Sequence, residues 1–117
     1  MASILEKKSL SFDDVLLVPT FSEVHPQEVD ISTRVGETVL KLPVFSAAMD
    51  TLTGEEMAKA LAKVGACGVV HKNMTVKKQV EIAAILDNER RKNDNYHFAV
   101  AVGVNDYERI YHLLNAS

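Results

Sequence analysis

Residues 43–117 predict an α/β fold made of three consecutive strand–helix units. Three short segments typical of buried strands, 43–48, 68–72 and 98–104, each precede a stretch in which apolar residues recur every three or four positions. Strands that alternate with helices in this way favour parallel pairing and right-handed crossovers. Two architectures follow: an open doubly wound sheet, or part of a (β/α)8 barrel.

The first unit combines the apolar run Pro43–Ala48 with a helix that begins near Thr53. Thr53 and Glu56 have the spacing of a capping box, in which each side chain binds a free backbone N–H group. Gly65 is suited to end this helix. The expected apolar face of the helix consists of Met57, Ala60, Leu61 and Val64.

The second and third units repeat this plan. A helix is expected from Thr75 to about Arg91, and a third helix is expected after a cap at Asn105 or Asp106. The run 98–104 is almost continuously apolar, as in a parallel strand covered on both faces. The expected apolar faces are Val76, Val80, Ala83 and Ala84 in the second helix, and Tyr107, Ile110, Tyr111 and Leu114 in the third.

Residues 1–42 predict an extended arm and entry segment rather than a packed domain. The apolar run Val15–Val18 is stopped by Pro19, and polar residues follow it. We expect a short strand around Val29–Ile31 and a second pairing segment at Val39–Leu42. The expected organisation is therefore an arm, 1–42, followed by three strand–helix units, 43–117.

Composition excludes several classes of protein. The chain has 117 residues, of which 47% are hydrophobic and 25% charged, as in an ordinary globular domain. A net charge of −3 gives no electrostatic basis for binding nucleic acid. One cysteine, Cys67, allows no internal disulfide and is expected to be a small buried hydrophobe. With neither a signal peptide nor an apolar run long enough to span a membrane, a cytoplasmic protein is expected.

Polar clusters lie at the ends of the first two predicted strands. The first cluster is Ser46–Thr51, and the second is His71–Met74. Because ligands bind at the carboxyl ends of parallel strands, both clusters are expected at one rim. No glycine-rich nucleotide loop follows any run, and no cysteine or histidine spacing typical of a metal site is present.

Each cluster also has a structural interpretation. Asp50 and Thr51 are common in the turn that enters a helix, and Met49 often fills gaps in a core. His71 is more often a structural histidine than a catalytic one. Lys72 at the end of a buried strand needs an anion, either a phosphate or a carboxylate such as that of Asp50.

Two long segments resemble a known family. SFDDVLLVPTFSEVHPQEVDISTRV and LPVFSAAMDTLTGEEMAKALAKVGACGVVHKNM are similar to the N-terminal part of the inosine-5′-monophosphate (IMP) dehydrogenase and guanosine-5′-monophosphate (GMP) reductase family. The resemblance covers residues 9–83, and FAVAVGVND continues it less specifically. FDDVLL, SAAMDT and HKNM in this order make the signature specific.

The resemblance implies a (β/α)8 barrel, of which this chain supplies the first three units, and assembly as a homotetramer. It also implies a purine nucleotide substrate, IMP or GMP. In the dehydrogenases a cysteine attacks the purine, hydride passes to NAD⁺, and water releases the product. The reductases convert GMP with NADPH. A monovalent cation in the parent protein would have its ligands outside this chain.

The resemblance also assigns roles to individual residues. Met49 would lie against the purine ring, the backbone near Ala47 would face the nucleotide, and Asp50 would orient that turn. The remaining implied site residues are Ser46 beside the nucleotide, His71, Lys72 and Asn73 at the cofactor side of the rim, and Ser22 and Pro26 at a neighbouring subunit's dinucleotide site.

Two departures from the family pattern bear on function. The regulatory domain pair that most dehydrogenases carry before the third strand is replaced by a short linker, about Arg91 to His97. SAAMDT together with HKNM favours the dehydrogenase over the reductase. The catalytic cysteine loop of the family has no counterpart here, so we expect part of a longer enzyme that is inactive by itself. The alternative is a non-catalytic protein that binds nucleotide or full-length subunits.

Overall fold

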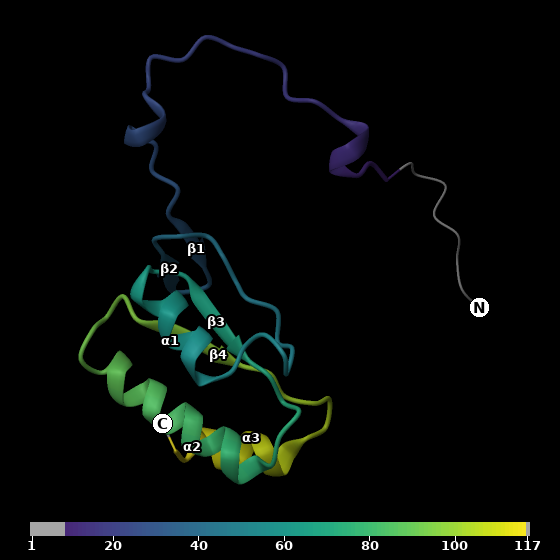
Figure 1. Ribbon diagram of the computed structural model, residues 1–117, viewed down its shortest axis with the longest axis vertical. Coiled ribbons are helices and arrows are strands. Elements are labelled where there is room, and N and C mark those ends of the chain that lie inside the picture. Colours follow the sequence, from purple (N-terminus) through teal and green to yellow (C-terminus); the bar gives the residue numbers. More distant parts are fainter. Residues whose placement is uncertain (1–8, 117) are drawn as a thin grey trace.

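The computed structural model describes residues 9–116, which form an α/β fold preceded by an extended arm (Figure 1). Residues 1–8 of the expected arm and residue 117 lie outside the described part. Two short 3-10 turns, Phe12–Asp14 and Pro26–Glu28, come first. The remaining elements are β1 (Thr33–Val35), β2 (Thr38–Leu40), α1 (Glu55–Lys63), β3 (Cys67–Val70), α2 (Val76–Arg90), β4 (His97–Val100) and α3 (Tyr107–Leu114).

The strands β3 and β4 pair in parallel, and α2 connects them. Cys67 lies opposite His97, and Val70 lies opposite Val100. Both strands are shorter than the apolar runs 68–72 and 98–104 that predicted them. The backbone still continues the pairing one step further, because the Ala101 N–H donates to the Val70 carbonyl at 2.9 Å. The expected strand–helix–strand order is confirmed here.

The predicted first strand, 43–48, is reduced to a single parallel bridge between Phe45 and Cys67. The Cys67 N–H donates to the Val44 carbonyl at 3.0 Å, and the Ser46 N–H donates to the Cys67 carbonyl at 3.1 Å. At the next step the Val69 N–H donates to the Ser46 hydroxyl at 2.9 Å. A side chain therefore takes the place of a backbone acceptor, and the chain leaves the sheet at Ser46.

The arm ends in an antiparallel hairpin made of β1 and β2, with Gly36 at φ +61° in its turn. The expected strand at Val29–Ile31 was placed too early, because those residues remain irregular. The second expected segment, Val39–Leu42, overlaps β2. Leu40 at the end of β2 is fully buried and attaches the hairpin to the folded part.

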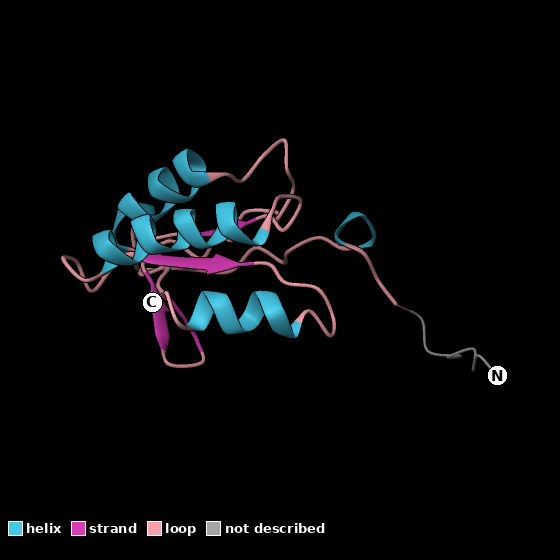
Figure 2. Ribbon diagram, turned by 90° about the horizontal axis from the view of Figure 1, so that it is seen from below, coloured by secondary structure: helices cyan, strands magenta, loops and turns pink. Residues whose placement is uncertain are grey.

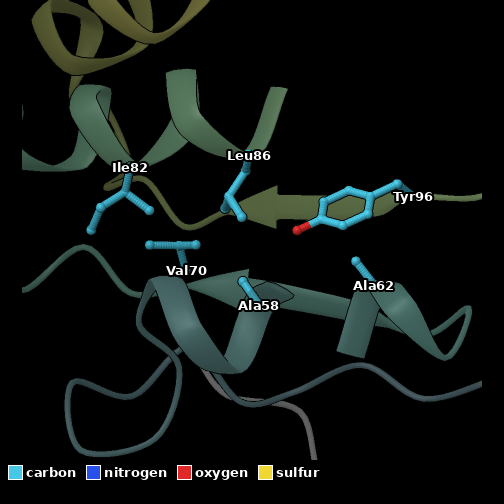
Figure 3. Packing of buried hydrophobic residues seen from close by; sticks show 6 residues of the cluster. All are labelled: Ala58, Ala62, Val70, Ile82, Leu86 and Tyr96. Carbon is cyan, nitrogen blue, oxygen red and sulfur yellow. The ribbon is translucent and has the colours of Figure 1, made fainter. Parts of the chain in front are cut away.

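The core lies between α1, β3 and α2 (Figure 3). It contains Ala58, Ala62, Val70, Ile82, Leu86 and Tyr96. Small residues of α1 allow that helix to approach the sheet closely. A Cβ atom added at Gly68 would lie 2.4 Å from the Ala58 Cα, so this position of β3 requires glycine.

The helix faces differ from the expected ones. In α1 the buried residues are Ala58 and Ala62, whereas Met57 and Val64 of the expected face are exposed. In α2 Ala83 is buried as expected, but Ala84 is exposed. In α3 the expected face is mostly exposed and Leu113 is buried instead. Apolar spacing identified the helices but not the side of each helix that packs.

The helix ends confirm two caps and correct one. Asp106, one of the two predicted caps of α3, accepts the backbone N–H group of Arg109. Thr75, which was predicted to begin the second helix, is the N-cap of α2 and accepts the backbone N–H group of Lys78. Gly65 follows α1 at φ +78°, a conformation that glycine adopts without strain. The capping box at Thr53 was wrong, because Gly54 is the N-cap of α1 and the Thr53 side chain is bound elsewhere.

The arm extends away from the folded part in both overall views (Figures 1 and 2). Its apolar side chains are exposed, among them Phe12, Leu16, Leu17, Val18 and Phe21. Hydrogen bonds within the arm are local, such as the Asp14 N–H to the Ser11 carbonyl. Within the described residues, none of the helices has the length and apolar character needed to cross a bilayer.

Candidate functional site

The segment 46–53, called here the first rim loop, follows the point where the chain leaves the sheet. Two bonds close the loop: the Thr53 N–H donates to the Met49 carbonyl at 2.9 Å, and the Thr53 hydroxyl donates to the Ala47 carbonyl at 2.6 Å. The Thr53 side chain is fully buried, so this hydroxyl bond is shielded from water. The loop holds Met49 with its side chain about half exposed.

The segment 71–75, called here the second rim loop, follows β3 and is tied to the first. The His71 N–H donates to the Thr53 carbonyl at 3.2 Å. The Asn73 Nδ2 donates to the Asp50 Oδ2 at 2.6 Å. The two polar clusters predicted from sequence are therefore joined at the carboxyl-terminal end of the strands. A hydrogen bond to a carboxylate is stronger than one between neutral groups, so this link fixes the relative position of the loops.

The prediction that Lys72 could pair with the Asp50 carboxylate was wrong. Asn73 holds the Asp50 carboxylate, whereas the Lys72 Nζ lies 3.5 Å from where a Cβ of Gly103 would be. A side chain at Gly103 would thus touch both Lys72 and Asp106. Lys72 forms no ion pair with any other described residue, which leaves its ammonium group available to an anion.

His71 is buried, and its Nδ1 has no hydrogen-bond partner among the residues that the structure describes. Such a buried polar atom is uncommon and calls for an explanation in a native fold. His71 is the first residue of the second rim loop, and its backbone N–H binds the Thr53 carbonyl of the first rim loop.

Sequence analysis missed three residues that hold the rim. Thr53 was expected to be a helix cap. Gln79, in α2, is fully buried, and Arg109, in α3, donates to Gln79, Met74 and Asp106. The only sequence signal for Gln79 was a polar residue on a helix face that also carries Ile82, Ala83 and Leu86. That signal is present in the sequence but does not by itself indicate a residue that holds the rim.

Other predicted positions are separate from the rim. Ser22 and Pro26 lie in the exposed arm, where the Ser22 hydroxyl bonds only to the backbone of Val24. Cys67 begins β3, at the opposite end of the strand from the rim loops. Burial raises the pKa of the Cys67 thiol, which disfavours the thiolate needed for nucleophilic attack. Within residues 9–116 no three metal-ligating side chains gather into a candidate metal site.

Polar loops that meet at the carboxyl end of parallel strands define a class: α/β proteins that bind a ligand at this edge. The model of the IMP dehydrogenase / GMP reductase domain matches residues 9–117. The chain belongs to this family.

Curated relatives narrow the comparison. The chain is 53% identical over 74 residues to an inosine-5′-monophosphate dehydrogenase of Methanocaldococcus jannaschii, which covers 63% of this chain and 15% of the relative. It is 53% identical over 76 residues to the enzyme of that name from Aquifex aeolicus, covering 64% of this chain and 16% of the relative. The Streptococcus pyogenes enzyme is 50% identical over 76 residues, covering 64% and 15%. The chain thus spans about one-sixth, or less, of the length of these relatives.

Proposed function

We propose that this chain forms the nucleotide-binding rim of an IMP dehydrogenase that oxidises IMP to xanthosine monophosphate with NAD⁺. The observation that carries the proposal is the 2.6 Å bond between Asn73 and Asp50, which joins the SAAMDT and HKNM segments into one site. The names of the curated relatives support a dehydrogenase rather than a reductase.

The rim residues have separate roles in this proposal. Met49, about half exposed on a loop closed by Thr53, offers an apolar surface to the purine ring. Ala47 and Ser46 form the turn beside the nucleotide. Asp50 does not contact the substrate but holds the turn through Asn73. A preorganised turn of this kind lowers the entropy cost of placing the purine for reaction.

The cofactor side of the site is assigned to the second rim loop. The unpaired ammonium group of Lys72 and the exposed amide of Asn73 suit an anionic or polar group of a nicotinamide dinucleotide. NAD, when bound, accepts the hydride. His71 connects this loop to the first rim loop, since its backbone N–H donates to the Thr53 carbonyl.

The catalytic nucleophile belongs to another part of the whole protein in this proposal. Cys67 is unsuitable because it is buried, its pKa is raised, and it starts β3 rather than ending it. We further propose that residues 43–117 are the first three units of a (β/α)8 barrel, and that residues 1–42 form an arm. Exposed apolar side chains such as Phe12 and Leu17 support an arm that packs on other subunits of a homotetramer.

In such a tetramer Ser22 and Pro26 would contribute to a neighbouring subunit's dinucleotide site. The arm supports this assignment because both residues are exposed, and because the arm extends away from the folded part (Figure 1). Water-soluble nucleotide substrates agree with the cytoplasmic location expected from the sequence.

The test is an enzyme assay on a hybrid protein. Residues 9–117 of this chain would replace the matching part of the Methanocaldococcus jannaschii dehydrogenase, so that a whole enzyme is assayed. We expect NADH formation from IMP and NAD⁺, and no NADPH consumption with GMP. NADPH consumption with GMP and no reaction with IMP would instead show that this rim selects the reductase reaction. The isolated 117-residue chain serves as the inactive control.

A further inference from the structure

The side chain of Gln79 is fully buried, yet it is a primary amide in the middle of an apolar helix face. Its Nε2 donates to the His71 carbonyl at 3.1 Å and to the Ala101 carbonyl at 2.9 Å. These carbonyls come directly after the last residues of β3 and β4. Strand pairing has ended there, so Gln79 supplies the donors that the sheet no longer provides.

The remaining polar atom of Gln79 is bound by Arg109. One guanidinium nitrogen donates to the Gln79 Oε1 at 2.8 Å, and the other terminal nitrogen donates to the Met74 carbonyl at 3.1 Å. The Nε donates to the Asp106 Oδ2 at 2.8 Å. The Arg109 side chain is only 12% exposed. One planar group therefore joins α2, the second rim loop and the start of α3.

The acceptors held by this pair surround Lys72 and Asn73. His71 and Met74 flank those two residues in the chain. Ala101 lies two residues before Gly103, the residue beside which the Lys72 Nζ lies. Asp106, the third group bound by Arg109, would also contact a Cβ atom at Gly103. Both the backbone of the second rim loop and the surface facing Lys72 thus depend on the same two side chains.

From this geometry we infer that Gln79 and Arg109 are positioning residues, which fix the second rim loop so that Lys72 and Asn73 face the ligand. An apolar residue at position 79 would fill the same space but would leave the two carbonyls without donors. The inference rests on the proposed function for its catalytic consequence, but the geometry it asserts can be tested separately.

The first test measures amide hydrogen exchange in the 117-residue chain. Gln79→Met keeps the length of the side chain and removes its hydrogen bonds. Arg109→Met keeps an unbranched apolar stem, which is shorter than the arginine side chain, and removes the hydrogen bonds of the guanidinium. We expect exchange at the His71 and Met74 amides to accelerate about tenfold or more. Local opening of the second rim loop costs less free energy in the variants, because the bonds from Gln79 or Arg109 no longer have to be broken. Lys77→Met, an exposed substitution on α2, is the matched control and should change neither amide.

The amide of Cys67 is the internal reference, since it is bound to Val44 at the opposite end of β3. It should retain most of its protection in both variants. Equal acceleration at Cys67, His71 and Met74 would mean a general loss of stability and would overturn the inference. Unchanged exchange at His71 and Met74 would overturn it as well.

The second test uses the hybrid enzyme and separates kcat from KM. Gln79→Met and Arg109→Met should lower kcat about tenfold, because misplacing groups beside the reacting centre weakens transition-state interactions. The KM for IMP should stay within about twofold, since the first rim loop is untouched. An unchanged kcat would contradict a positioning role. If the unmodified hybrid shows no turnover with either nucleotide, the proposed function fails, and the exchange experiment still decides the inference.

Discussion

The Asp87 side chain is 4% exposed and keeps its charge because two arginines reach it. The Arg90 guanidinium lies 2.6 Å from the Oδ1, and the Arg91 Nε lies 2.7 Å from the Oδ2. Bonds from Arg91 and Arg90 hold the pKa of Asp87 below its usual range, although burial acts in the opposite direction. Arg90 and Arg91, at the C-terminal end of α2, thus neutralise a buried carboxylate.

Because the pKa of Asp87 is lowered in the folded state, we expect the protein to lose stability in acid. The native pKa lies below the unfolded value of about 3.9, so the unfolded chain takes up the proton first as the pH falls. The stabilisation is present above that value and is lost as the pH drops through the native pKa. Asp87→Asn should cost roughly 1–2 kcal/mol at neutral pH and flatten the acid limb.

Urea unfolding between pH 3 and pH 7 measures this effect. The range includes the unfolded pKa of about 3.9, at which half of the Asp87 carboxyl groups in the unfolded chain are protonated. Asp94→Asn in the exposed linker is the control. An Asp87→Asn variant with the same acid dependence as the unmodified chain would exclude this role for Asp87.

At the scale of elements, side-chain size decides how α1 meets β3. A Cβ at Gly68 would approach the Ala58 Cα to 2.4 Å, and backbone cannot yield as a flexible side chain can. Gly68→Ala should therefore destabilise the fold by about 2–3 kcal/mol through overpacking. Thermal or urea unfolding gives the value.

The matched control for this change is Gly54→Ala, where nothing lies within 4 Å of the added carbon. That substitution should cost less than about 1 kcal/mol, since it affects only the N-cap of α1. Similar losses for both variants would show that the contact between α1 and β3 is not as tight as described.

The elements show how far sequence could predict this fold. Three helices, the two parallel strands, the start of the second helix at Thr75 and the cap at Asp106 followed from local patterns that the fold retains. The position at which the chain leaves the sheet did not, because it depends on Ser46 accepting a bond from Val69 in a distant segment. The packed face of α1 also depended on tertiary contact: two alanines are buried and larger apolar residues are exposed.

The candidate site, too, could be predicted only in part from the sequence. Both polar clusters and their meeting at one rim followed from strand ends and motif identity. The partners within the rim did not, because Asn73 rather than Lys72 takes the Asp50 carboxylate. Gln79 and Arg109 could not be inferred, since their roles require carbonyls of two strands and a loop to converge.

At the scale of the whole molecule, the described arm and the folded part are nearly independent (Figure 1). Residues 11–28 form local hydrogen bonds and expose their side chains, whereas burial begins at Leu40 in the hairpin. Deleting residues 9–28 should change the free energy of unfolding by less than about 0.5 kcal/mol, as for exposed positions in general.

Urea unfolding of the shortened chain, followed by far-ultraviolet circular dichroism, measures this independence. The hybrid enzyme lacking the same segment should fail to form the proposed homotetramer in sedimentation analysis. A shortened chain that fails to fold would contradict the description of the arm as unpacked.

The central claim is that two separate segments form one site through Asp50 and Asn73, and a double-mutant cycle in the hybrid enzyme tests it most directly. Asp50→Ala and Asn73→Ala should each lower kcat/KM for IMP about tenfold or more, because each breaks a hydrogen bond to a charged group. Combined, they should cost little more than either alone, since both remove the same interaction. Losses that simply add, or single variants with unchanged kcat/KM, would contradict the claim.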